Sequence, residues 1–100
     1  MIRRGTTPTH TFTLPFGQDQ IKDIRISYTQ DDVEIVVKQL DDCTFNGNDC
    51  IVSLTQVETF SFEEGKADIQ IRILTTVDTV LNSDIITRSV YKSLNEEVLK

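Results

Sequence analysis

Three side chains in the sequence have the chemistry for nucleophilic catalysis: His10, Cys43 and Cys50. A cysteine thiol becomes an effective nucleophile when a histidine close to it takes its proton. The spacing of these residues does not bring the imidazole to either thiol, and the sequence offers too few further residues to complete a catalytic set. We therefore expect His10 to be an ordinary exposed side chain and the chain not to be an enzyme.

Metal and cofactor sites are equally hard to assemble from this sequence. A single histidine cannot form a multi-histidine metal site, and the four glycines are scattered one to a turn instead of forming a phosphate-binding loop. The segment DDCTFNGNDC partly imitates a calcium-binding loop that would begin at Asp42. The twelfth position of such a loop should be a bidentate glutamate, and here it is Ser53. We predict no metal site and no cofactor.

Asn46 and Gly47 favour a different structure, the two-residue turn of a β-hairpin, since both residues tolerate a positive φ angle. A type I′ turn centred on them places Cys43 directly opposite Cys50, where a disulfide is geometrically possible. A cytosolic origin favours two free thiols instead, and a shift of the turn by one residue would separate the two side chains. The sequence leaves both states open.

The opening segment, MIRRGTTPTHTFTLPF, joins two arginines to a threonine-rich stretch. A secretory signal needs an apolar run of about 7 to 15 residues after its basic start. The threonines interrupt any such run, and they argue against a twin-arginine signal for the same reason. We expect no export by these routes, so the chain should fold in a reducing cytosol.

Charge is distributed unevenly along a chain whose net charge is −6. Residues 31–68 carry ten acidic and two basic side chains, so this middle part repels phosphate. Arg3 and Arg4 alone cannot supply the basic surface that nucleic acids require, and we interpret them as a solvated, mobile tip. The sequence also has no apolar run long enough to span a membrane. We expect neither direct nucleic-acid binding nor a membrane span.

Apolar and polar residues alternate along most of the chain, which is the pattern of half-buried β-strands. The clearest case is ADIQIRIL, in which Ile69, Ile71 and Ile73 share one face. The same alternation predicts strands near residues 11–14, 24–29, 33–38, 50–55 and 84–92 and a tight hairpin turn at residues 30–32.

Two of these predicted strands have further features. Residues 11–14 form the first strand, and the prolines just outside it, Pro8 and Pro15, favour a place at a sheet edge. In the run 84–92, Arg88 is in phase with Ile86 and Val90, so the inward face of this strand is ambiguous.

The last residues change character, because Ser93 and Glu96 match a capping box. We predict a single helical turn over residues 94–99, with Leu94 and Val98 on one face.

Seven or eight short strands separated by turns predict an all-β fold, an immunoglobulin-like antiparallel β-sandwich, with a small barrel as the alternative. One hundred residues form one domain, so we assign residues 8–100 to the sandwich and residues 1–7 to a flexible N-terminal tail.

Three segments together resemble small proteins of tailed bacteriophages and prophages: MIRRGTTPTHTFTLPF, LTQVETFSFEEGKADIQIRILT and SDIITRSVYKSLNEEVL. The pattern of strands and turns is similar to the immunoglobulin-like N-terminal module of phage upper-baseplate proteins. The resemblance implies a structural or assembly protein of the baseplate, tail or capsid. Such a protein is made in the host cytoplasm and resides in the virion, where it contacts itself and other virion proteins as a homo-oligomer.

A ligand-binding module, with a carbohydrate as one candidate ligand, is the alternative function. A sugar site usually presents an exposed aromatic platform with polar neighbours. The sequence has no tryptophan, and most of its aromatic side chains are needed for the core. The structural function is therefore preferred.

Overall fold

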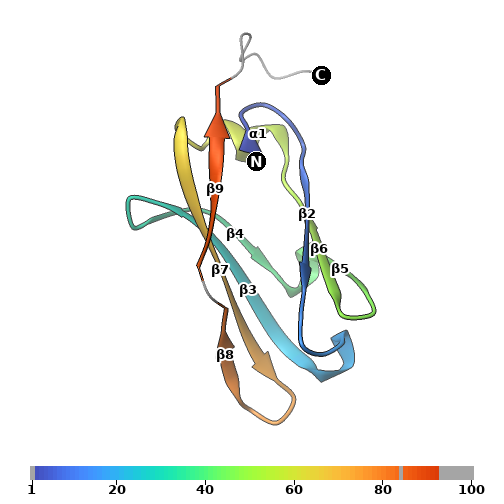
Figure 1. Cartoon of the computed structure of the whole chain (residues 1–100). Coiled ribbons are helices and arrows are strands. Elements are labelled where there is room, and N and C mark those ends of the chain that lie inside the picture. The colour runs from blue at the N-terminus through green and yellow to red at the C-terminus, as the bar shows by residue number, and fades with distance from the viewer. Residues whose placement is uncertain (1, 84, 93–100) are drawn as a thin grey trace.

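Strands make up 59% of the described residues and helices 12%, and the strands form two sheets (Figure 1). The structure, a computed structural model, describes residues 2–83 and 85–92. The large sheet has the order β1 (Ile2–Arg3), β9 (Ile86–Tyr91), β7 (Gly65–Thr75), β3 (Ile21–Gln30) and β4 (Val33–Gln39), with β8 (Val80–Asn82) also paired to β7. The small sheet has the order β2 (Thr9–Thr13), β6 (Asp49–Ser53) and β5 (Cys43–Asn46). The connecting helices are η1 (Gln18–Gln20), η2 (Leu40–Asp42) and α1 (Gln56–Phe60).

This strand order is that of an immunoglobulin-like sandwich, as the sequence predicts. The large sheet places β4, β3, β7 and β9 in the order C′, C, F, G, and the small sheet places β2, β6 and β5 in the order B, E, D. The large sheet is mixed, because β1 pairs with β9 in parallel. In an immunoglobulin sandwich the first strand lies beside strand B, whereas in the described residues of this chain that side of β2 is left open.

The core lies between the sheets and is formed by the residues that alternate inward. Ile69, Ile71 and Ile73 on β7 are all buried, which confirms the strand predicted from ADIQIRIL. Burying an isoleucine side chain stabilises a fold by roughly 2 kcal/mol. Tyr28 and Phe62 are the largest fully buried side chains, and their rings meet edge to face with centroids 6.0 Å apart. The two aromatic side chains fill the centre of the sandwich.

The two hairpin turns differ in how well the sequence predicts them. Asp31 and Asp32, with φ angles of 50° and 63°, form the predicted turn between β3 and β4. The second hairpin turns at Gly47 and Asn48, one residue later than expected, and pairs Asn46 with Asp49. Gly47 has a φ of 60°, whereas Asn48 has no positive φ, as in a type II′ turn.

The N-terminal segment corrects the expectation of a flexible tail over residues 1–7. Ile2 and Arg3 pair with Val90 and Tyr91 of β9, and the Ile2 side chain is fully buried. Gly5 has a φ of 80° and packs so closely that a Cβ atom there would lie 2.6 Å from the Phe60 ring. Backbone pairing and burial therefore hold this segment against the domain.

Helix α1 is an element that the sequence analysis misses. Its start is a capping box between Thr55 and Glu58, the same sequence pattern as at Ser93 and Glu96. The helical turn predicted for residues 94–99 lies outside the described residues. No helix in the described part of the chain is both long and apolar enough to cross a membrane.

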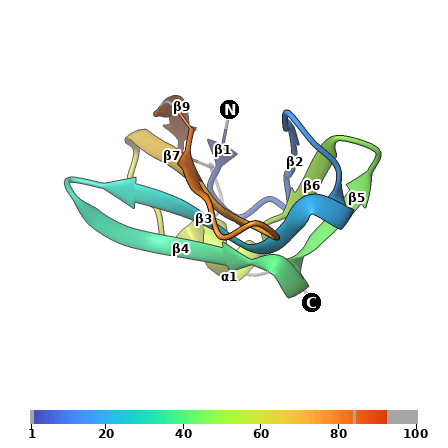
Figure 2. The same ribbon diagram turned by 90° about the horizontal axis from the view of Figure 1, so that it is seen from below.

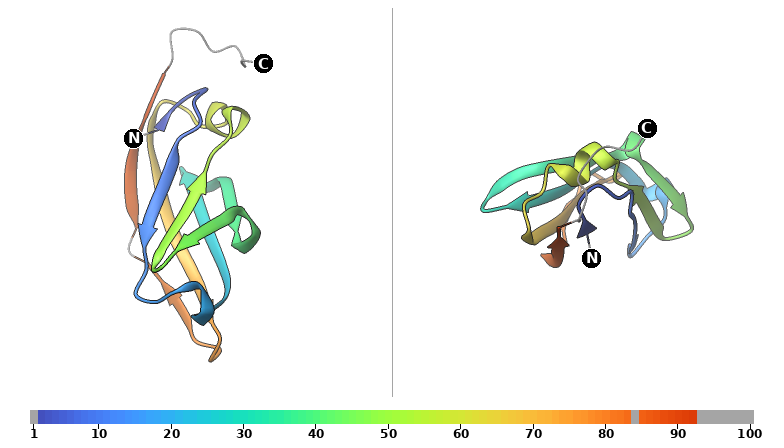
Figure 3. Two further views of the ribbon diagram at one scale, coloured as in Figure 1. Left: turned by 90° about the vertical axis from the view of Figure 1, so that its right-hand side faces the viewer. Right: turned by 90° about the horizontal axis from the view of Figure 1, so that it is seen from above.

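The two sheets are joined on one side and separate on the other. On the first side β4 continues through η2 into β5, so the chain itself links the sheets. On the second side β9 and β2 stand apart, and β1 lies between them near one end (Figures 2 and 3). The open side therefore has the edges of both sheets along its rim.

Candidate functional site

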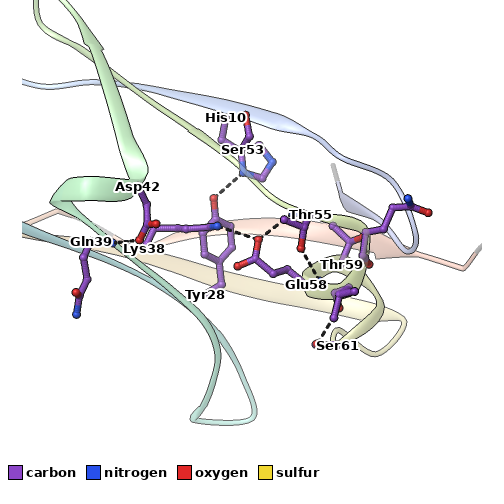
Figure 4. Close-up of polar contacts among 12 residues, drawn as sticks. His10, Tyr28, Lys38, Gln39, Asp42, Ser53, Thr55, Glu58, Thr59 and Ser61 are labelled. Carbon is purple, nitrogen blue, oxygen red and sulfur yellow. Dashed lines mark hydrogen bonds and ion pairs between the residues drawn. The ribbon is translucent and has the colours of Figure 1, made fainter. Parts of the chain in front are cut away.

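A polar cluster surrounds Glu58, the third residue of α1, where the helix meets β4 (Figure 4). The Lys38 ammonium on β4 lies 2.8 Å from Glu58 Oε1. The same oxygen accepts the Thr55 backbone N–H at 2.8 Å, and the Thr55 hydroxyl accepts the Glu58 N–H at 3.1 Å. One carboxylate thus completes the capping box and ties α1 to the large sheet.

The charges of this pair depend on each other, because Lys38 is only 8% exposed. Partial burial acts to raise the pKa of Glu58, but hydrogen bonds from Lys38 and from the Thr55 amide outweigh it. The pKa of Glu58 is therefore lowered in the folded protein. The Glu58 side chain is 27% exposed, so solvent screens part of the attraction and the pair makes a modest contribution to stability that needs both members.

We expect Glu58→Gln to lower the free energy of unfolding by about 1 kcal/mol at pH 7, because the amide keeps the geometry but not the charge. Because folding lowers the pKa of Glu58, its ionised carboxylate stabilises the folded protein fully at pH values above the ordinary carboxyl pKa of about 4.3. This stabilisation is lost as the pH falls through the folded pKa. Urea unfolding should therefore show a difference between variant and wild type at pH 7 that disappears in acid. Glu64→Gln, at an exposed acid, is the control and should match the wild type at both pH values.

His10 and Tyr28 form a second contact between the two sheets. His10 Nδ1 lies 2.7 Å from the Tyr28 hydroxyl, and the two rings stack with centroids 5.7 Å apart. Burial, with a smaller effect from Glu58, raises the pKa of Tyr28 far above its ordinary value, so the hydroxyl stays neutral. His10 is half-buried instead of exposed, which corrects the sequence-based expectation, and its ring positions Tyr28.

The two cysteines lie on neighbouring antiparallel strands, as predicted, but they are not directly opposite. Cys43 pairs with Val52 and Phe45 pairs with Cys50, so the thiols are diagonal neighbours. Both are free. Cys43 Sγ donates to the Gln39 carbonyl at 3.3 Å. The closeness of the two thiols raises the pKa of Cys43 and lowers that of Cys50. Cys43 thus engages a backbone carbonyl and lies diagonally beside Cys50, whereas His10 contacts Tyr28.

The segment that partly imitates a calcium-binding loop forms a helix cap and a strand instead. Asp42 accepts the Gln39 N–H at 2.9 Å and caps η2, while the following four residues form β5. Within residues 2–83 and 85–92, no three His, Cys, Asp or Glu side chains are grouped to hold a metal ion. The local chemistry of this segment is that of a helix cap and a hairpin.

A groove of about 670 Å³ lies on the open side of the sandwich. Its floor is aliphatic and comes mainly from Ile69, Ile71 and Ile73 of β7. One wall is β2 with the residues up to Pro15, and the other is formed by residues 81 and 82 of β8, by Ser83, and by residues 86 and 88 of β9. Residues that are distant in the chain form this groove, so no local sequence pattern marks it.

The wall formed by β2 presents backbone groups as well as side chains. The Leu14 N–H donates to the Asn48 carbonyl and the Leu54 N–H donates to the Pro8 carbonyl, so the even-numbered residues of this stretch bond towards β6. In an antiparallel ladder the intervening residues face the other way. The N–H and C=O groups of Thr9, Thr11 and Thr13 therefore point to the open edge. This edge offers a row of hydrogen-bonding groups to another strand.

Arg88 gives the groove its positive charge. It is directly opposite Ala67 in the β9–β7 ladder, and directly opposite residues share one face of a sheet. Because Ala67 is buried, Arg88 lies on the inward face of β9, between Ile86 and Val90. The side chain lines the groove and remains exposed, with one guanidinium nitrogen 3.2 Å from the Thr87 carbonyl. This resolves the phase that the sequence left ambiguous.

The groove can bind an extended chain, since it combines an open strand edge, an aliphatic floor and one cation. Of the three residues considered for catalysis, the two cysteines lie on the hairpin. His10 lines the groove, with its ring against Tyr28. Comparison with known protein families, with curated proteins and with solved structures gives no match for this chain.

Proposed function

We propose that the chain is an assembly protein of a tailed-phage particle, which acts through contacts with other virion proteins and with copies of itself. The observation that carries the proposal is the groove, because it joins two open sheet edges to an aliphatic floor. An open edge binds an added strand through the backbone, and alternate side chains of that strand fill the pockets. The resemblance of the sequence to phage baseplate modules supports the same role.

The charge distribution favours the groove as the place of contact. The chain has a net charge of −6, so two copies repel each other over much of their surfaces. None of the described residues that line the groove is acidic, and Arg88 is basic. Two copies can therefore approach at the groove without bringing carboxylates together. In a symmetric particle many such contacts reinforce one another, even when each is weak.

The alternative, a carbohydrate-binding module, has less support. Sugar sites usually present an exposed aromatic surface. The floor of the groove is aliphatic, and Phe12, which also lines it, is only 9% exposed. The groove fits the side chains of a polypeptide better than the polar rings of a sugar.

A virion protein should be found in purified particles. We expect mass spectrometry of phage particles, from cells whose phage carries this coding sequence, to detect the chain in many copies. We also expect light scattering of the purified protein to show self-association. A protein that is strictly monomeric, absent from particles and made only early in infection would rule the structural role out.

A further inference from the structure

The groove lies where an immunoglobulin-like sandwich has its first strand. That strand would pair with the open side of β2 and cover the inward face of the sheet behind it. Here β1 supplies only Ile2 and Arg3, and it covers the end of β9 at Val90. Ile86 and Arg88, further along the same face, line the groove instead. The described part of the fold thus has room for one more strand.

We propose that this place is taken by residues 93–100 of a second copy of the chain, bound as an added strand along β2. The inference rests on the proposed function, since it names the partner of the same groove. Residues 93–100 lie directly after the described end of the chain and outside the described residues. Each copy then gives its own segment to the next copy, which is a head-to-tail contact that forms a ring where the rotation closes.

The length of this segment suits the open edge. Eight residues in extended conformation span about 26 Å, and the six residues between Pro8 and Pro15 span about 20 Å. Proline has no N–H to donate, so the two prolines limit the pairing to residues 9–14.

The side chains of this segment also match the groove. In a strand, Leu94, Glu96 and Val98 share one face because they are spaced by two residues. Two aliphatic side chains then cover the isoleucine floor, and the carboxylate between them faces Arg88. The opposite phase would place Ser93, Asn95 and Glu97 inward, which buries polar groups on an apolar floor. An inward-facing arginine disfavours the binding of strands that have no acidic side chain to pair with it. The pairing of Arg88 with Glu96 therefore makes the contact specific for this segment.

The test is a charge exchange in the full chain, with self-association measured by analytical ultracentrifugation. We expect Arg88→Glu and Glu96→Arg each to weaken association about tenfold, and the double variant to recover most of it, because the pair is restored with its sign reversed. Glu97→Arg makes the same change in net charge as Glu96→Arg on the other face of the strand. It should leave association nearly unchanged.

A backbone test separates strand pairing from other contacts at the groove. Thr11→Pro removes an N–H that points to the open edge and that β6 does not use, and it should abolish association. Thr11→Ala keeps this N–H and should associate like the wild type. Circular dichroism and thermal unfolding of every variant show whether the fold is kept.

Three results would overturn the inference. A full chain that is monomeric at all concentrations would do so. Association that survives Thr11→Pro would also overturn the inference. It would leave the proposed function intact, since another surface would then join the copies. Loss of association in Thr11→Pro without rescue in the Arg88→Glu, Glu96→Arg double variant would show that a different segment occupies the groove. Detection in particles tests the proposed function independently of all three.

Discussion

Replacing Tyr28 with alanine is expected to lower the free energy of unfolding by about 4 kcal/mol, the largest effect that we predict for a single side chain. Tyr28 is completely buried at the centre of the sandwich, between His10 of the small sheet and Phe62 beyond α1. Truncation removes both ring contacts and leaves a cavity that the two sheets cannot close. Urea unfolding followed by circular dichroism measures this loss.

Tyr28→Phe is the matched control, because it keeps the ring and removes only the hydroxyl that meets His10 Nδ1. The expected loss is about 1 kcal/mol, the usual value of one hydrogen bond. A loss in the alanine variant no larger than in the phenylalanine variant would show that the ring does not fill the core. The two sheets would then be held together elsewhere.

The sequence predicts the parts of the fold whose pattern is local. Ile69, Ile71 and Ile73 alternate with polar residues along β7, and such alternation is what a sheet with one buried face requires. The turn at Asp31 and Asp32 is predictable for the same reason, since two short polar residues separate two alternating segments. The immunoglobulin-like architecture follows from the number and spacing of such segments.

Where two local structures suit the same residues, sequence reasoning chooses wrongly. Gly47 fits the second central position of a type I′ turn after Asn46, and it equally fits the first central position of a type II′ turn before Asn48. The structure adopts the second arrangement, which makes Cys43 and Cys50 diagonal instead of opposite. The capping box of α1 starts at Thr55, the last residue of a predicted strand, so the strand pattern there hides the start of the helix.

The candidate site was beyond sequence reasoning, because it depends on pairings between distant segments. The open edge of β2 exists because β1 pairs with β9 instead. A strand of two residues shows no periodicity, so nothing in the sequence marks Ile2 and Arg3 as an element of the sheet. Arg88 shows the signal that could be used in future: a charged residue in phase with apolar neighbours indicates an inward face that is left open.

Ile2→Ala is expected to lower the free energy of unfolding by about 3 kcal/mol, although the residue is the second in the chain. Its side chain is fully buried, and its partner Val90 lies on the inward face of β9. The loss of this side chain exposes the end of the sandwich next to the groove. The Gly5 N–H donates to the Thr59 hydroxyl at 3.0 Å and also fixes this segment. The backbone therefore cannot shift to fill the cavity that the substitution leaves.

Arg3→Ala, at the exposed neighbouring position, is the control for Ile2→Ala and should cost less than about 1 kcal/mol. Limited trypsin digestion gives a second measurement, since Arg3 and Arg4 are cleavable only where the chain is accessible. We expect slow cleavage in the wild type and rapid cleavage in Ile2→Ala, because β1 must leave β9 before the protease can bind. Equal stability of the two variants, with rapid cleavage in both, would restore the interpretation of residues 1–7 as a flexible tail.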